Sequence, residues 1–232
     1  MRIVTWNCQS GLRKKTAALL ALDPDLAIVP ECTQGAAAAL TSAGYHQLWF
    51  GDPDARGLAV FFKPQFTLKP LGEPVRSWIV PLDVSCAAHF TLIAVWPCQK
   101  GGGISGYVKL LRDAFAEHAD WFGHGPVVVA GDFNSNAQFD ITSDRNHASL
   151  VSFLSKQGLV SAYHSHFQEE QGAETRPTFY MNRMQDEPFH VDYIFLPRAW
   201  MSSVTSVEVG TFAQWAALSD HRPLTVDLAP TA

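Results

Sequence analysis

The spacing of hydrophobic and polar positions predicts alternating strands and helices in the first part of the chain. Short runs of β-branched and aromatic residues, typical of buried strands, occupy 2–6, 26–29 and 58–62. Segments rich in Ala and Leu, which predict helices, occupy 14–22 and 34–43. Pro24 stops the first helix before the second strand begins. We therefore expect a strand–helix–strand unit at the start of the chain.

The rest of the chain contains fewer helices and more strands. Apolar positions at helical spacing predict helices over 107–121 and 147–156. Apolar runs predict strands at 78–84, 90–96, 126–130, 159–162, 191–196, 204–209 and 224–228. The strands 78–84 and 90–96 can pair around 85–89. This mixture fits two packed sheets with helices outside better than one doubly wound sheet.

Polar residues recur at five places after, within or before these apolar strands. They are Asn7, Glu31, Asp132, Asn134, Asp192, Asp220 and His221. Each of them alone is also typical of a turn or a helix cap. Strand ends of packed sheets can meet at one rim, and the whole set therefore favours a common site there.

Residues 131–134 read Gly-Asp-Phe-Asn directly after the run Val127–Ala130. In an extended segment, Asp132 and Asn134 point to one side and Phe133 points into the core. Gly131 suits a place where another chain segment or a substrate comes close.

Asp192 lies among apolar neighbours, where an ionised carboxylate is costly unless hydrogen-bond donors or a cation meet it. His221 is a natural partner, with its ring oriented by Asp192 and its other nitrogen free to face an anion. The pair Asp220-His221 before a strand also suits an ordinary turn.

Length and composition limit the remaining possibilities. The 232 residues, 47% of them hydrophobic, fit one soluble domain over 1–232. The net charge of −5 (17 Lys and Arg, 22 Asp and Glu) argues against a general polyanion binder, so phosphate binding must be local. The four cysteines lack CxxC spacing, which favours buried thiols. Without a signal peptide or a long apolar stretch, a cytoplasmic location is expected.

Five ordered motifs resemble those of the endonuclease/exonuclease/phosphatase superfamily, which includes deoxyribonuclease I and exonuclease III. The motifs are Thr5-Trp6-Asn7, Pro30-Glu31, Gly131-Asp132-Phe133-Asn134, Val191-Asp192-Tyr193-Ile194 and Ser219-Asp220-His221-Arg222-Pro223. They run over nearly the whole chain, which looks like a small, stand-alone, bacterial-type member. The resemblance implies a four-layer α/β sandwich, with two packed mixed β-sheets flanked by helices and a Mg²⁺- or Mn²⁺-dependent site at one rim.

The resemblance also implies a role for each polar residue. Glu31 is expected to be the main metal ligand, with Asn7 beside it and Asp220 completing the acidic cluster. Asp132 is expected to orient or deprotonate the attacking water, which Asn134 helps to hold. Asp192 is expected to position His221 against a phosphoryl oxygen. Phosphate ester hydrolysis needs such a hard cation, a base and charge-stabilising donors.

The substrate side is less sharply defined by the sequence. Family members carry Tyr or His at the end of the strand before the long helix, where this chain has Trp96, which can donate one hydrogen bond or simply pack in the core. Phe179 and Phe189 resemble the aromatic wall of the abasic-site branch, and they too can be core residues. Arg13 and Arg145 are candidate phosphate contacts, to which Arg56, Arg176 and Arg183 can add; all of them can instead be ordinary surface charges.

These observations together predict a phosphoesterase. A nuclease acting on DNA or RNA is the first prediction. It depends on Arg13-Lys14-Lys15 at the positive end of the first predicted helix, where a phosphate can bind. The alternatives are a phosphatase or phosphodiesterase on an inositol phosphate, a sphingomyelin-type lipid or another small phosphoester, and a non-catalytic binding member of the same fold. A serine hydrolase and a P-loop nucleotide switch are disfavoured, because neither GxSxG nor GxxxxGK[ST] occurs.

Overall fold

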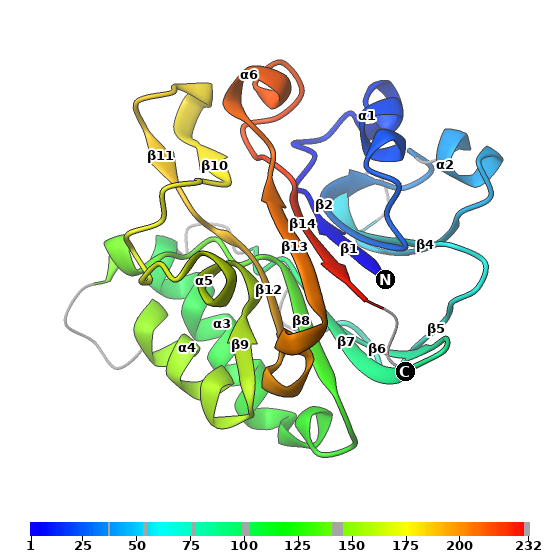
Figure 1. The fold of residues 1–232 in the computed structure, drawn as a ribbon. Coiled ribbons are helices and arrows are strands. Elements are labelled where there is room, and N and C mark those ends of the chain that lie inside the picture. The colour runs from blue at the N-terminus through cyan, green and yellow to red at the C-terminus, as the bar shows by residue number, and fades with distance from the viewer. Residues whose placement is uncertain (37, 53–54, 76–77, 99–102, 141–145, 230–232) are drawn as a thin grey trace.

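Two six-stranded mixed sheets pack face to face, and helices lie on the outer side of each sheet (Figure 1). The computed structural model describes residues 1–36, 38–52, 55–75, 78–98, 103–140 and 146–229. Within these residues, no helix has the length and apolar character needed to cross a bilayer.

The first sheet has the strand order β13-β14-β1-β2-β4-β3. Its strands are β1 (Arg2–Thr5), β2 (Leu26–Thr33), β3 (His46–Phe50), β4 (Arg56–Phe62), β13 (Val204–Val209) and β14 (Leu224–Leu228). Strand β1 lies parallel to β2 and antiparallel to β14, so the sheet joins the two ends of the chain.

The second sheet has the order β5-β6-β7-β8-β12-β9. Its strands are β5 (Thr67–Pro70), β6 (Ile79–Ser85), β7 (His89–Val95), β8 (Val127–Asp132), β9 (Leu159–Ser161) and β12 (Asp192–Pro197). A separate short hairpin pairs β10 (Phe179–Tyr180) with β11 (Pro188–Phe189). Strand β8 lies parallel to β7 and antiparallel to β12.

The helices are short except for two that cover the second sheet. The α-helices are α1 (Thr16–Ala21), α2 (Ala38–Ser42), α3 (Gly103–Glu117), α4 (His147–Lys156), α5 (Ala162–Phe167) and α6 (Phe212–Trp215). Single 3₁₀ turns occupy Leu12–Lys14, Ala119–Phe122, Ala137–Phe139, Met181–Arg183 and Arg198–Ser203.

Three hydrophobic clusters explain the layering. The largest lies between the sheets and includes Ile28 of β2 and Val128 of β8. The next side chain along each strand points to the opposite face, so Val29 packs in the cluster with α1 and α2, and Val129 in the cluster with α3 and α4. Both faces of the central strands are buried, which is why they read as continuous apolar runs. The predicted four-layer α/β sandwich is confirmed.

Most predicted elements are present, and the differences arise where glycine or a bulge interrupts the pattern. The hairpin at 78–96 is formed by β6 and β7, and the helix at 147–156 is α4. The helix predicted over 34–43 is wrong in its first half, because Gly35 adopts φ 71° in a turn and α2 begins only at Ala38. The helix predicted at 14–22 is reduced to a 3₁₀ turn and α1. Helix α5 and the β10–β11 hairpin lie between the predicted strands 159–162 and 191–196, in a stretch where the sequence predicts no helix or strand.

Candidate active site

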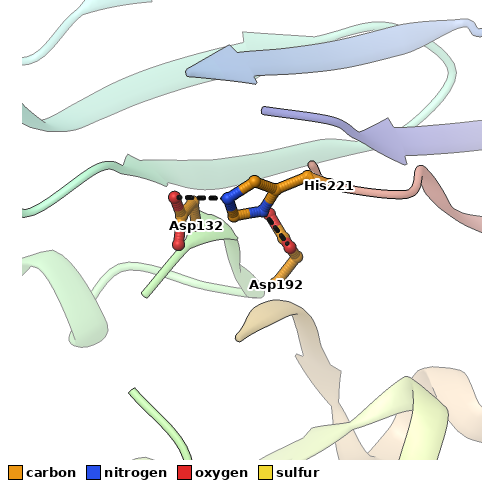
Figure 2. Close-up of side chains that lie close together, drawn as sticks. All are labelled: Asp132, Asp192 and His221. Atoms are coloured by element: carbon orange, nitrogen blue, oxygen red, sulfur yellow. Dashed lines mark hydrogen bonds and ion pairs between the residues drawn. The ribbon is translucent and has the colours of Figure 1, made fainter. Parts of the chain in front are cut away.

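Three buried side chains from three distant segments meet at one end of the two sheets (Figure 2). Asp132 ends β8, and Asp192 begins β12 directly opposite it in the antiparallel register. His221 comes from the loop before β14. Its Nδ1 lies 2.8 Å from Asp192 Oδ2, and its Nε2 lies 3.9 Å from Asp132 Oδ2. The imidazole therefore lies between two carboxylates.

The electrostatics of this group favour a charged histidine. Burial by itself would lower the pKa of His221, but the negative charges of Asp192 and Asp132 outweigh burial and raise this pKa to about 10. Burial also raises the pKa of Asp132 to about 7, although the His221 charge and a hydrogen bond from Asn7 act in the opposite direction. Asp192 Oδ1 is buried and has no hydrogen-bond partner among the described residues. One buried carboxylate oxygen of this group therefore has no donor among the described residues.

The loop that carries His221 is fixed to the first strand. Ser219 Oγ accepts a hydrogen bond from the His221 amide at 3.0 Å and donates one to the Asn7 carbonyl at 2.8 Å. The indole of Trp6 donates to the His221 carbonyl at 3.3 Å. The residue after β1 and the residues before β14 are thus held together, which brings Asn7 to the same place as His221.

Thr178 fixes the backbone on the other side of the Asp192–His221 pair. Its Oγ1 accepts hydrogen bonds from the amides of Val191 and Asp192, both at 3.0 Å, and its carbonyl accepts one from the Arg222 amide. The hydroxyl thus ties the start of β12 to the segment that leads into β10, and the carbonyl ties that segment to the residue after His221.

Asn7 connects this group to Glu31. Its Nδ2 donates to Asp132 Oδ2 at 2.9 Å and to Glu31 Oε1 at 3.3 Å. Glu31 was expected just past its strand, but it lies inside β2, where the pairing with β4 shifts register between Val29 and Cys32. In this bulge Glu31 adopts φ 58°, and its other oxygen contacts Arg56.

Asp220 lies at the edge of the same cluster. It is half-buried, and its Oδ2 accepts a hydrogen bond from Gln9 Nε2 at 2.7 Å. Among the described residues, the compact group that could hold a metal ion consists of Asp132, Asp192 and His221, whose ligand atoms lie within 4.8 Å of one another.

The Gly-Asp-Phe-Asn sequence is extended as far as Asp132, where β8 ends, and the backbone changes direction at Asn134. Asp132 Oδ1 accepts the Asn134 amide at 2.8 Å, Asn134 adopts φ 50°, and its Nδ2 donates to the Pro97 carbonyl at 3.3 Å. The expectation that Asp132 and Asn134 extend side by side is therefore wrong, whereas Phe133 is buried as predicted. Gly131 has φ 145°, and a Cβ there would lie 1.9 Å from the Val95 carbonyl oxygen, so only glycine fits.

Of the two aromatic candidates, Phe179 lies beside the histidine and Phe189 lies beside Phe179. Phe179 and Phe189 are paired in the β10–β11 hairpin. The Phe179 ring centroid is 4.7 Å from that of His221, and the Phe189 ring centroid is 4.7 Å from that of Phe139. Both phenylalanines are partly exposed, so they form an apolar border at this end of the site.

Two other substrate candidates lie in different environments. Trp96 is only 4% exposed and belongs to the cluster between the sheets, because it follows β7 into the core. This burial agrees with the packing alternative, and a role of Trp96 in substrate contact stays a prediction. Arg13 is exposed, while its neighbour Lys15 turns inward to the carbonyls of Cys8 and Ser10. Arg145 lies outside the described residues.

Sequence reasoning missed Gln9, which joins three parts of the site. Its backbone amide donates to Asn7 Oδ1 at 2.9 Å. In its side chain, Nε2 donates to Asp220 Oδ2 and Oε1 accepts from Arg183 Nε at 3.0 Å. The position of Gln9 two residues after Asn7 was the available signal. The cross-chain contacts to Asp220 and Arg183 could not be inferred from spacing.

Comparison with known proteins identifies a family whose sequence profile matches this chain. The sequence profile of the Endonuclease/Exonuclease/phosphatase family matches residues 4–221. This range spans the site from Asn7 to His221. A search of curated proteins finds no match.

Several solved structures share the fold at low sequence identity. The 3' phosphatase NExo from Neisseria, bound to a product DNA hairpin, has a TM-score of 0.68 and 19% identity, with 99% of this chain and 100% of that chain covered. An AP endonuclease from Archaeoglobus fulgidus has a TM-score of 0.71 and 18% identity, with 98% and 99% covered. The human Nocturnin catalytic domain with bound sulfate has a TM-score of 0.69 and 19% identity, with 100% and 94% covered.

These structures establish a common fold, and the sequence profile extends over nearly the whole chain. The chain therefore belongs to the Endonuclease/Exonuclease/phosphatase family.

Proposed function

We propose that this chain is a divalent-metal-dependent phosphodiesterase that hydrolyses nucleic acid with an activated water molecule. The observation that carries the proposal is a continuous line of polar contacts. It runs from Asp192 through His221, Asp132 and Asn7 to Glu31. This line places a cationic donor, a carboxylate base and a second carboxylate at one end of the sandwich.

A hard cation fits the carboxylate end of this line. Glu31 and Asp132 both lie within hydrogen-bond distance of one Asn7 nitrogen, so their oxygens face a common place. His221 is less suited as a ligand, because a protonated imidazole has no free lone pair. We assign metal binding to Glu31, Asn7 and Asp220, in keeping with the preference of Mg²⁺ and Mn²⁺ for oxygen ligands. When bound, such an ion supplies Lewis-acid polarisation of the phosphoryl oxygen.

The chain's own residues supply the proton chemistry. Asp132 has a pKa of about 7, which suits a base that accepts a proton from water near neutral pH. Asp192 holds His221 by Nδ1, so that Nε2 can donate to a phosphoryl oxygen, and the His221 pKa of about 10 keeps this donor charged. Asn134 helps to hold the water or phosphate from the turn after β8.

Nucleic acid is the substrate class that we favour. Phe179 offers an apolar ring beside His221, and Phe189 extends this surface, so that a sugar or base can rest on it. Exposed Arg13 offers charge for a phosphate. NExo, which has the same fold, is bound to a DNA hairpin. Because the net charge of the chain is −5, the attraction for a nucleic acid must come from such local groups.

A substrate panel tests the proposal. The panel holds an abasic-site duplex, single- and double-stranded DNA, RNA, sphingomyelin, an inositol polyphosphate and bis-p-nitrophenyl phosphate, each with Mg²⁺, Mn²⁺ or EDTA. Glu31→Gln, Asp132→Asn and His221→Gln should each lower metal-dependent cleavage by several orders of magnitude. Asp227→Asn, which breaks a distant pair with Arg2, is the matched control and should keep activity.

The outcomes separate the alternatives. Metal-dependent cleavage of DNA or RNA supports the proposal and selects the branch. Turnover of the lipid or inositol substrate alone would replace nucleic acid by that class. Metal binding without any hydrolysis would favour a non-catalytic binding member of the family.

A further inference from the structure

Arg56 forms an ion pair with the carboxylate proposed as the main metal ligand. Its guanidinium contacts Glu31 Oε2 from the start of β4. The Glu31 side chain is 18% exposed, whereas that of Arg56 is 53% exposed. A half-exposed cation therefore contacts one oxygen of a mostly buried anion.

This pair belongs to the same line of contacts as the rest of the site. The other Glu31 oxygen, Oε1, accepts from Asn7, which also donates to Asp132. The neighbouring Cys98 thiol reports the same arrangement: burial raises its pKa, the charge of Arg56 lowers it, and the charges of Glu31 and Asp132 raise it. The charges of Arg56, Glu31 and Asp132 thus all lie within electrostatic range of Cys98.

The backbone keeps Arg56 next to Glu31 whatever its side chain does. Arg56 pairs with Thr33 across β2 and β4, immediately beyond the bulge that contains Glu31. If the guanidinium leaves Glu31, it still lies within one side-chain length of the site. It is then a planar donor suited to a phosphodiester.

We propose that Arg56 is a resident counter-cation of Glu31, which leaves this carboxylate when a divalent ion binds and then contacts the anionic substrate. The inference rests on the proposed metal-dependent function. Its physical basis is that two cations at one carboxylate repel each other, so Arg56 competes with the metal until it moves. Arg56 thus lowers the affinity for the metal and raises the affinity for the substrate.

The opposite signs make the proposal testable. Arg56→Ala should bind Mn²⁺ about fivefold more tightly than the unmodified chain, as expected for loss of a partly exposed competing ion pair. The same variant should show a KM for its phosphodiester substrate raised about tenfold at saturating metal. Arg56→Lys keeps the charge and should lie between the two proteins in both quantities.

Isothermal titration calorimetry with MnCl₂ on the full chain, without substrate, measures the first effect, and steady-state kinetics measures the second. Lys63→Ala is the control, because this substitution also removes one positive charge. Lys63 lies just past the opposite end of β4, where it pairs with Asp23 and Asp25. Circular dichroism checks that each variant is folded.

The proposed function and this inference can fail separately. Absence of Mn²⁺ binding by the unmodified chain, or unchanged binding in Glu31→Gln, would remove the metal assignment itself. With that assignment intact, unchanged or weaker Mn²⁺ binding in Arg56→Ala would overturn the competing role of Arg56. Tighter Mn²⁺ binding with an unchanged KM would overturn its role in substrate binding.

Discussion

Asp192→Asn tests the electrostatic account of the site most directly. The change keeps the shape of a fully buried side chain and removes its charge. His221 then loses the strongest opposing charge at its Nδ1, 2.8 Å away, while its burial remains. Burial and the remaining charge of Asp132 then act in opposite directions, so we expect the pKa of His221 to fall from about 10 toward its ordinary 6.5.

The size of the effect follows from this pKa shift. At pH 8, His221 should be about 99% protonated in the unmodified chain and about 3% protonated in the variant. A raised folded-state pKa contributes stability that is fully present below pH 6.5 and is lost as the pH rises through 10. Breaking a buried pair costs about 3–5 kcal/mol. The variant should lose about that much unfolding free energy at pH 6, and the loss should shrink toward pH 10.

The assay is NMR of histidine ring carbons in the metal-free protein, with His221 assigned by comparison with His221→Gln. Hydrolysis of bis-p-nitrophenyl phosphate against pH gives a second measure. If charged His221 donates to the phosphoryl oxygen, the variant's activity should fall above pH 6.5, where the unmodified chain keeps this donor. Urea denaturation at pH 6 and pH 9.5 measures the stability difference.

The reasoning would be refuted by a His221 signal that titrates near pH 10 in both proteins, or near pH 6.5 in both. Asp227→Asn serves as the control, because it also removes one carboxylate from an ion pair but lies in the distant contact with Arg2. It should leave the His221 titration unchanged.

Three further predictions concern the support of the site. Gly131→Ala should destabilise the protein by about 3 kcal/mol or more in urea denaturation, because its Cβ would meet the Val95 carbonyl at 1.9 Å; near-native stability would contradict this. Glu174→Gln should cost about 3 kcal/mol at pH 7: burial opposes the charge of Glu174, but hydrogen bonds from His164 and a backbone amide lower its pKa to about 2. This stability is present above pH 4.5 and lost as the pH falls through 2, so a loss that does not shrink in acid would count against it. Gln9→Ala should lower kcat/KM about tenfold with an unchanged circular dichroism spectrum, because the loops that it joins lose their register; full activity would show that Gln9 is dispensable.

The layers of the fold were predictable because strand and helix periodicities report which faces are buried. Ile28 and Val29 point to opposite sides of the same strand and enter different clusters, and such alternation is visible in the sequence once both faces are known to be covered. The acidic residues were predictable as a set because they lie at or near strand ends, and strand ends can meet at a rim.

The remaining details depend on local backbone geometry that periodicity does not record. The bulge at Glu31 adds residues to one strand without changing its apolar pattern. The burial of Trp96 depends on the direction in which the chain leaves β7, and tryptophan suits either a core or a surface edge. The contacts of Gln9 and Arg56 cross between segments far apart in the chain, so no spacing indicates them.

Backbone strain connects the shape of the site to its chemistry. Gln9, Glu31 and Asn134 all have positive φ, a conformation that costs a non-glycine residue about 1 kcal/mol or more. The side chains proposed for chemistry also hold this backbone: Asn7 Oδ1 accepts the Gln9 amide, and Asp132 Oδ1 accepts the Asn134 amide. An alanine substitution at Asn7 or at Asp132 would remove both a side chain proposed for chemistry and a support of the backbone. Asp132→Asn retains an oxygen for the Asn134 amide while removing the charge, so its loss of activity would report the chemistry of the carboxylate rather than collapse of the turn.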